Sequence, residues 1–99
     1  LTVVGDGKQT RDFIHVDDLT NAFVKTIKSN LVNKIYNLGS GKETSINRIA
    51  NIFGGKKTFI PIRPNEPKRS LANISKIKKD IKWKPLITIQ EGVKRLLEN

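Results

Sequence analysis

The chain has 99 residues and no cysteine, and its 19 Lys and Arg residues against 9 Asp and Glu give a formal net charge of +10 at pH 7. This length allows one domain at most, and the lack of cysteine excludes disulfides, thiolate metal ligands and a cysteine nucleophile. With one histidine and scattered acids we expect no metal site. No apolar run approaches the ~20 residues that span a bilayer and no secretory signal is visible, so we expect a cytoplasmic protein without a membrane partner.

The basic charge raises the question of its partner, because such chains bind nucleic acid, anionic membranes or small anions. The lysines are densest over residues 76–84, where Trp83 is the one aromatic residue. Single-strand binders interleave aromatic residues with their basic ones. We therefore disfavour nucleic acid and expect an anionic small ligand. A free-standing basic module that binds nucleic acid is the alternative, and its affinity would fall steeply with salt.

The N-terminal part predicts two strands and a helix. Residues 1–4 indicate a strand, and the Gly-Asp-Gly sequence of residues 5–7 indicates a turn. The apolar residues Phe13, Ile14 and Val16 indicate a short buried strand, and Asp17 or Asp18 then caps a helix that runs to about residue 28. Its inward residues are expected at three- and four-residue spacing: Leu19, Ala22, Phe23, Thr26 and Ile27.

The middle of the chain predicts a strand over residues 34–38, closed by glycines in residues 39–41. Thr44 or Ser45 then caps a second helix, which Gly54 and Gly55 stop. Its apolar face is expected to consist of Ile46, Ile49, Ala50 and Phe53.

The C-terminal part predicts a strand over residues 57–62, followed by a long loop that three prolines hold extended: Pro61, Pro64 and Pro67. Residues 75–80 indicate a short helix. A capping box at residues 88–91 opens the last helix, with Ile89, Val93, Leu96 and Leu97 directed inward. Strands that alternate with helices indicate a mixed α/β chain, part of a parallel sheet with a small appended lobe.

Four segments together resemble the extended short-chain dehydrogenase/reductase family, the NAD-dependent nucleotide-sugar epimerases and dehydratases. They are the turn, arginine and helix start of residues 5–19, the strand and glycines of residues 34–41, the loop and helix start of residues 63–76, and the ending in residues 82–97. The resemblance implies the C-terminal substrate-binding portion, residues 1–99, of an extended Rossmann-type enzyme. In that family residues up to about 40 tend to complete the nucleotide-binding sheet of the missing N-terminal half.

Two features of the family are missing from this chain. The dinucleotide site needs a glycine-rich turn before a helix N-terminus, and no Gly-x-x-Gly-x-x-Gly occurs here. The catalytic tyrosine of the family has a lysine four residues on, whereas Tyr36 is followed there by Ser40. The resemblance therefore implies NAD as the cofactor of a parent enzyme, with its site outside this chain, and no catalytic residue within it. Since the chain starts at Leu1 inside an apparent strand, we expect a fragment that is inactive alone. A catalytically dead nucleotide-sugar-binding subunit is the alternative.

The resemblance also implies which residues hold a nucleoside-diphosphate sugar. Arg11 and Arg63 match arginines that grip the diphosphate from two sides, as a bidentate guanidinium can. Glu66 matches an acid that accepts hydrogen bonds from the ribose. Asn37, at a strand end, is a further binding candidate. The structural alternatives are an ion pair of Arg11 with Asp12 or Asp17, and solvent exposure of the others.

Other polar residues are read as structural. Asn73 stands where the family has aspartate and is expected to cap a helix. His15 is expected to be hydrogen-bonded in the core, and Trp83 to pack there. Lys68 and Arg69 either raise the positive potential beside the Arg63 loop or form a solvated surface.

Overall fold

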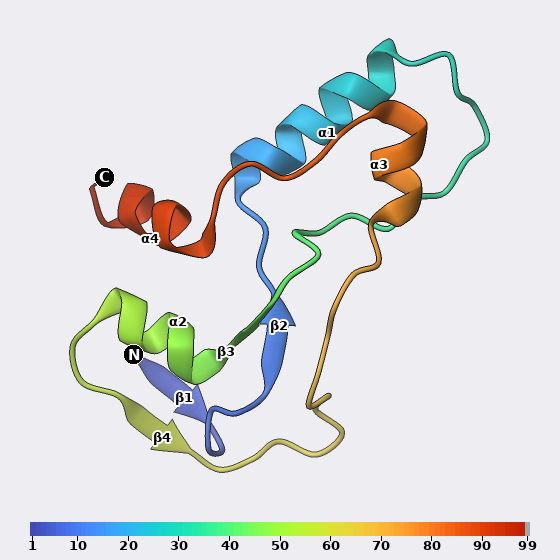
Figure 1. The fold of residues 1–99 in the computed structure, drawn as a ribbon. Coiled ribbons are helices and arrows are strands. Elements are labelled where there is room, and N and C mark those ends of the chain that lie inside the picture. Colours follow the sequence, from blue (N-terminus) through green and yellow to red (C-terminus); the bar gives the residue numbers. More distant parts are fainter. Residues whose placement is uncertain (99) are drawn as a thin grey trace.

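Two short strands far apart in the sequence form a parallel pair at one end of the molecule. The computed structural model describes residues 1–98, and in it β1 (Thr2–Val4) pairs with β4 (Thr58–Ile60), Thr2 opposite Thr58 (Figure 1). Both strands were predicted from the sequence, β4 within the longer range of residues 57–62. The turn after β1 is tied to β4, because the Gly5 N–H donates to the Ile60 carbonyl at 2.7 Å.

The second strand pair differs from the prediction. β2 (Thr10–Asp12) and β3 (Glu43–Ser45) run antiparallel. The buried strand expected over residues 13–16 is wrong, because β2 ends at Asp12 and Val16 begins a helix. The predicted strand over residues 34–38 is also absent from the described residues. A strand needs a neighbouring strand for its backbone hydrogen bonds. Among the described residues each strand pairs with one other strand, and none of them pairs with residues 34–38.

Helix α1 (Val16–Lys28) is capped by a residue that the sequence did not indicate. His15 is its N-cap, and its Nδ1 accepts a hydrogen bond from the Asp17 N–H at 3.0 Å. The prediction that Asp17 or Asp18 caps the helix is therefore wrong. Asp17 lies in the exposed first turn, where an acid suits the positive helix end.

Asp18 is buried and joins α1 to the segment before the last helix. Its carboxylate accepts hydrogen bonds from the N–H groups of Leu86 (3.0 Å) and Ile87 (2.9 Å). The indole N–H of Trp83 donates to the backbone oxygen of Asp18 at 3.1 Å. Trp83 is 1% exposed and packs with Ala22, as a core role predicts.

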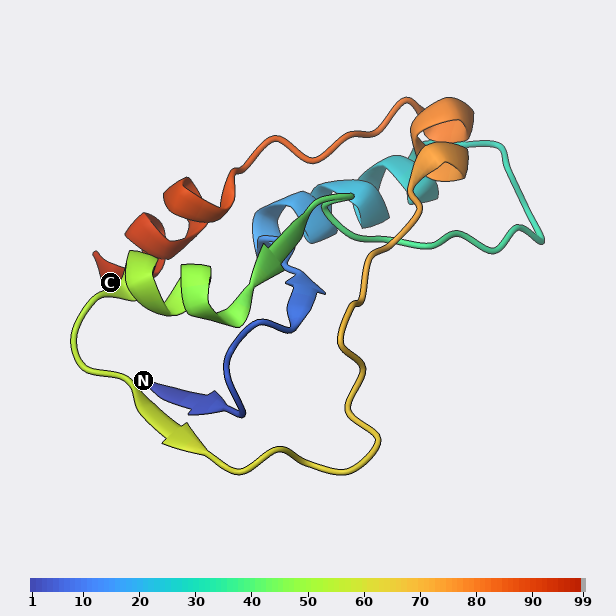
Figure 2. The ribbon, with the colours of Figure 1, turned by 60° about the horizontal axis from the view of Figure 1, so that its bottom comes forward.

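The apolar face of α1 is only partly covered. Ala22 is buried, but Phe23 is 57% and Ile27 82% exposed, so the expectation that they point inward is wrong. Figure 1 shows α1 at the edge of the molecule, and in Figures 1 and 2 α3 (Ser75–Ile81) lies beside part of it.

The remaining helices begin as predicted. Ser45 caps α2 (Ile46–Phe53) by accepting from the Arg48 N–H, and Gly54 ends it with φ near 80°. Thr88 caps α4 (Ile89–Leu97) through the Glu91 N–H. The reciprocal half of the capping box is not formed, since the Glu91 carboxylate binds Arg95. α2 packs against α4, with Ala50 and Val93 buried, whereas Leu96 and Leu97 are exposed.

The molecule is more extended than its length requires. Its Cα radius of gyration is 15.7 Å, against about 13 Å for a compact domain of this size. One core cluster forms between α1, α3 and the segment after α3, with Ala22, Ile74, Ile77 and Trp83 buried. The β1–β4 pair and α2 lie away from this cluster and form a second lobe. The β2–β3 pair connects this lobe to the lobe that holds the core cluster (Figure 1).

Candidate functional site

Arg11 lies at the centre of β2, opposite Thr44 of β3. Its Nη1 donates to the Thr10 carbonyl at 2.7 Å, and its Nη2 donates to Glu66 Oε1 at 3.1 Å. The partner of Arg11 is thus a residue 55 positions away, rather than either neighbouring aspartate. Both side chains are 25% exposed, so the pair is held in place but open to solvent.

One carboxylate oxygen of Glu66 lacks a hydrogen-bond partner among the described residues. This oxygen, Oε2, is buried. A buried oxygen without a donor costs free energy unless a ligand or water supplies one. The Arg11–Glu66 pair therefore combines a guanidinium with unused N–H groups and a carboxylate oxygen that still requires a hydrogen bond.

The loop that carries Glu66 is attached to β2. The Thr10 N–H donates to the Lys68 carbonyl at 2.8 Å, and the Ser70 N–H donates to the Thr10 carbonyl at 3.2 Å. Asn65, the residue before Glu66, has a φ of 61°. Asparagine tolerates this left-handed backbone better than most residues, which is compatible with a tight turn before Glu66.

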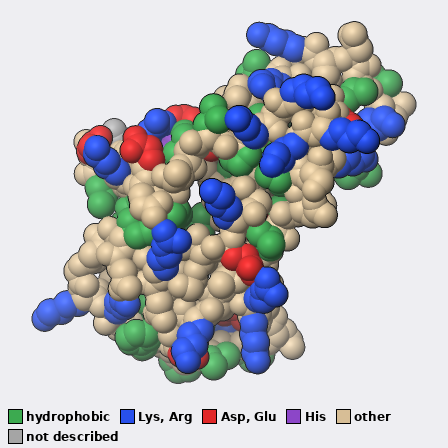
Figure 3. Space-filling model, in the orientation of Figure 1, with side chains coloured by type: hydrophobic (Ala, Val, Ile, Leu, Met, Phe, Trp, Pro, Cys, Tyr) green, Lys and Arg blue, Asp and Glu red, His purple; other side chains and the backbone are tan. Residues whose placement is uncertain are grey.

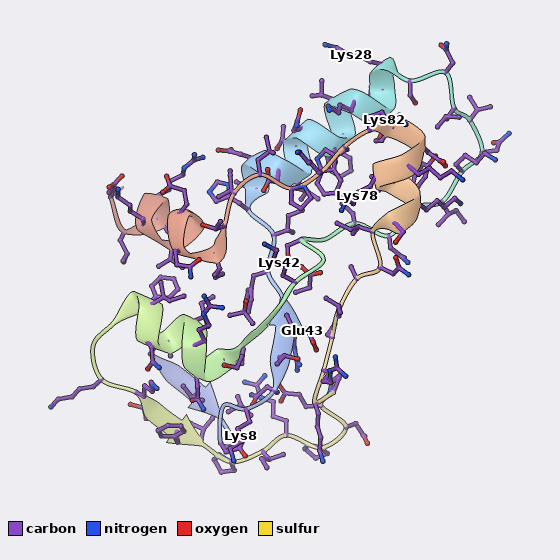
Figure 4. All side chains as sticks on the ribbon, in the orientation of Figure 1. Lys8, Lys28, Lys42, Glu43, Lys78 and Lys82 are labelled. Atoms are coloured by element: carbon purple, nitrogen blue, oxygen red, sulfur yellow. The ribbon has the colours of Figure 1, made fainter. Side chains whose placement is uncertain are left out.

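A cleft of about 530 Å³ lies between the β1–β2 turn and this loop. Its walls consist of Val4, Gly5, Asp6, Lys8 and Gln9 on one side and Ile62, Glu66, Pro67, Lys68 and Arg69 on the other. Figure 4 shows Lys8 on the turn, at the opposite end of the molecule from Lys28. The cleft thus offers apolar walls, cationic side chains and the carboxylate of Glu66.

Arg63 and Asn37 are both exposed. Arg63 lies next to Ile62 of the cleft wall and forms no hydrogen bond or ion pair within residues 1–98. Asn37 follows Tyr36, whose hydroxyl donates to Asp80 of α3 at 2.9 Å. The structure brings Arg11 and Glu66 together; the convergence of Arg63 and Asn37 on the same ligand stays a prediction.

Glu43 is a polar residue near the site that sequence reasoning missed. Its carboxylate accepts two hydrogen bonds from Arg69, each 2.7 Å, and one from the Thr10 hydroxyl at 3.0 Å. The Arg69 bonds, followed by the Thr10 bond, lower the pKa of Glu43 to about 2, and Glu43 raises the pKa of Arg69. The Glu43 partner opposes the positive charge of Arg69, which argues against the alternative in which Arg69 raises the positive potential beside the Arg63 loop. No local pattern links these residues, which lie 26 positions apart.

Charge elsewhere is dispersed. Figure 3 shows Lys and Arg side chains on both lobes of the visible face, with Asp and Glu among them. Among residues 1–98 no three His, Cys, Asp or Glu residues are grouped closely enough to hold a metal ion. In the same part of the chain, every helix is too short or too polar to cross a bilayer.

Comparison with known proteins gives consistent matches. Residues 1–39 match the model of the NAD dependent epimerase/dehydratase family. The chain is 37% identical over 102 residues to a UDP-glucuronate 4-epimerase of Thermodesulfobacterium geofontis, covering 96% of this chain and 31% of that protein. It is 38% identical to a putative UDP-glucose 4-epimerase of Methanocaldococcus jannaschii, covering 96% of this chain and 32% of that protein. The chain therefore spans about a third of the length of these relatives.

Solved structures agree with the described fold. The UDP-glucose 4-epimerase of Thermotoga maritima, solved with UDP-glucose, superposes with a TM-score of 0.90 at 25% identity, over 99% of this chain and 33% of that one. The UDP-glucuronic acid 4-epimerase of Bacillus cereus, solved with UDP-glucuronic acid and NAD, gives 0.81 at 30% identity, over 95% and 32% of the two chains.

Proposed function

The chain belongs to the NAD-dependent epimerase/dehydratase family, and from this premise we propose that it supplies the nucleotide-sugar contacts of an enzyme acting on a nucleoside-diphosphate sugar. The relatives are named for reactions of UDP-sugars. The Arg11–Glu66 pair beside the cleft is the observation that carries the proposal, because it combines a phosphate-binding cation with a hydroxyl-binding carboxylate.

Each residue of the proposed site has a chemical role. The planar fork of Arg11 donates to diphosphate oxygens. The carboxylate of Glu66 accepts hydrogen bonds from ribose hydroxyls. Arg63 approaches the diphosphate from the loop, and Asn37 adds a polar contact. These residues bind and orient the substrate, which lowers the entropic part of a reaction barrier.

NAD is the cofactor that the family name implies, but the residues described here do not fit it. A dinucleotide site needs a strand that leads through a glycine-rich turn into a helix N-terminus. β1 leads through its turn into β2, and β4 leads into a proline-rich loop. When bound, NAD supplies hydride transfer in this family; we place its site, and the proton-transferring tyrosine, outside this chain.

We further propose that residues 1–40 complete a sheet with a missing N-terminal half. The exposed apolar residues of α1 and of the segment after it support this arrangement. Val16, Phe23, Ile27, Val32 and Ile35 are each more than half exposed, and apolar patches of this kind mark contact surfaces.

Calorimetric titration of the protein with UDP-glucose, UDP and uridine tests the proposed function. We expect saturable binding of UDP-glucose and UDP, and much weaker binding of uridine, which lacks the phosphates. An oligonucleotide at physiological salt serves as the control for non-specific attraction of anions. Uridine binding as strong as UDP binding, or preference for the oligonucleotide, would overturn the proposal.

A further inference from the structure

The carboxylate of Asp12 joins three segments of the chain. Its Oδ1 accepts from the backbone N–H of Ser40 at 2.7 Å and from the Ser40 hydroxyl at 2.5 Å. Its Oδ2 accepts from the N–H groups of Gly41 at 3.0 Å and Ala72 at 3.2 Å. No Lys or Arg pairs with Asp12 within residues 1–98. A carboxylate with four donors is fixed in orientation, so Asp12 works as a structural joint rather than as half of an ion pair.

This joint leaves no room for a further atom. Gly39 is buried beside it, and a Cβ built on Gly39 would lie 2.7 Å from Asp12 Oδ2 and 2.8 Å from the Cβ of Ala72. Real Cβ atoms do not approach that closely, so a side chain at position 39 would push the segments apart. The glycine is therefore required here for close approach of backbone.

The Asp12 joint belongs to a series of attachments along β2. The segment between β4 and α3 has no regular structure, yet each residue of β2 holds it at a different point. The attachments are Thr10 to residues 68 and 70, Arg11 to Glu66, and Asp12 to Ala72. Asp12 provides the last attachment before α3, and it also anchors the glycine loop of residues 39–41.

We propose that Asp12 is a positioning residue of the nucleotide-sugar site. By fixing Ala72 against β2, it sets the course of the loop that presents Arg63 and Glu66 to Arg11. The inference rests on the proposed function. Its physical basis is that a loop with a fixed end has fewer conformations to lose when a ligand binds, and that binding groups need support from the residues behind them.

Asp12→Asn tests the proposal, with Asp80→Asn as the matched control. Asparagine keeps one oxygen, but its amide group would face the N–H groups of Gly41 and Ala72, donor against donor. Asp80 accepts a hydrogen bond from the Tyr36 hydroxyl on the exposed surface of α3, and an asparagine oxygen can replace it there.

Affinity for UDP-glucose is measured by calorimetry at a temperature where circular dichroism shows every variant fully folded. We expect about a tenfold or greater loss for Asp12→Asn, which corresponds to ~1.4 kcal/mol, and wild-type affinity for Asp80→Asn. Wild-type affinity in folded Asp12→Asn would show that Asp12 only stabilises the fold and would overturn the proposal. Ser40→Ala removes one donor hydroxyl and is expected to lose about two- to fivefold, so it decides the question if Asp12→Asn does not fold.

Amide hydrogen exchange separates this proposal from the proposed function. The Ser70 N–H is bonded to Thr10 rather than to Asp12. If Asp12 orders the loop, Ser70 exchange accelerates in Asp12→Asn. If acceleration is confined to residues 40, 41 and 72, the positioning role is wrong, whatever the ligand affinity. If the wild-type protein binds no UDP-glucose, the proposed function fails, and the Ser70 amide then shows only whether Asp12 orders the loop.

Discussion

Replacing Arg11 with alanine tests the centre of the proposed site. Its side chain is 25% exposed, and its guanidinium is held by Thr10 and Glu66 before any ligand arrives, so little side-chain freedom is lost when a diphosphate binds. A hydrogen bond to a charged group contributes about 1.5–3 kcal/mol, and partial exposure extends the lower limit to about 1 kcal/mol. We therefore expect nucleotide-sugar affinity to fall about 5- to 140-fold, at ~1.4 kcal/mol per decade.

Alanine at position 11 also leaves the Glu66 carboxylate without its cation. Arg11→Lys keeps the charge but loses the planar fork, and an intermediate affinity is expected.

The assay is calorimetric titration with UDP-glucose at two salt concentrations. The control removes two exposed charges elsewhere, Lys78→Gln/Lys79→Gln on α3, and should leave affinity nearly unchanged. The reasoning is refuted if Arg11→Ala binds like the wild type, or if the lysine variant loses as much affinity.

Three further predictions concern acid stability, the core and the cofactor. Because Arg69 holds the pKa of Glu43 at about 2, the contribution of Glu43 to stability is complete above about pH 4.5 and is lost as the pH falls toward 2. The urea midpoint should therefore change less between pH 6 and pH 3 in Glu43→Gln than in the wild type. An equal change in both proteins would contradict this. Trp83→Ala should cost about 3–5 kcal/mol of unfolding free energy, against near neutrality for exposed Lys84→Ala, and a loss below ~1 kcal/mol would refute the assigned core. Millimolar NAD should give no saturable heat with this chain, and a micromolar dissociation constant would exclude the assignment of its site elsewhere.

Local signals in the sequence predicted most of the helices. Ser45 and Thr88 cap where their side chains predict, and Gly54 ends α2, because caps depend on neighbouring residues. The helix start at α1 was placed at an aspartate, since histidine is a less common cap. The buried Asp18 could not be predicted, because its donors, Leu86 and Ile87, are almost 70 residues away.

The site was predictable only as far as the motif resemblance extended. The resemblance identified Arg11 and Glu66 separately as binding residues. Their ion pair could not be predicted, because it joins two segments that no periodicity of the sequence connects. The Glu43–Arg69 pair and the Asp12 joint were missed for the same reason. The strand expected over residues 34–38 is the opposite kind of error, a predicted element that does not form, because β propensity alone does not form a strand without a partner.

The register of β1 with β4 has a consequence for synthesis on the ribosome. Thr2 pairs with Thr58, so within the described residues β1 has no hydrogen-bonding partner until β4 has been translated. β2 and β3 lie closer in sequence and can pair earlier. Contacts of long sequence separation form slowly, and an unpaired strand edge attracts other chains. A nascent chain stalled before residue 58 would therefore expose β1, and ribosome stalling there should increase its capture by chaperones.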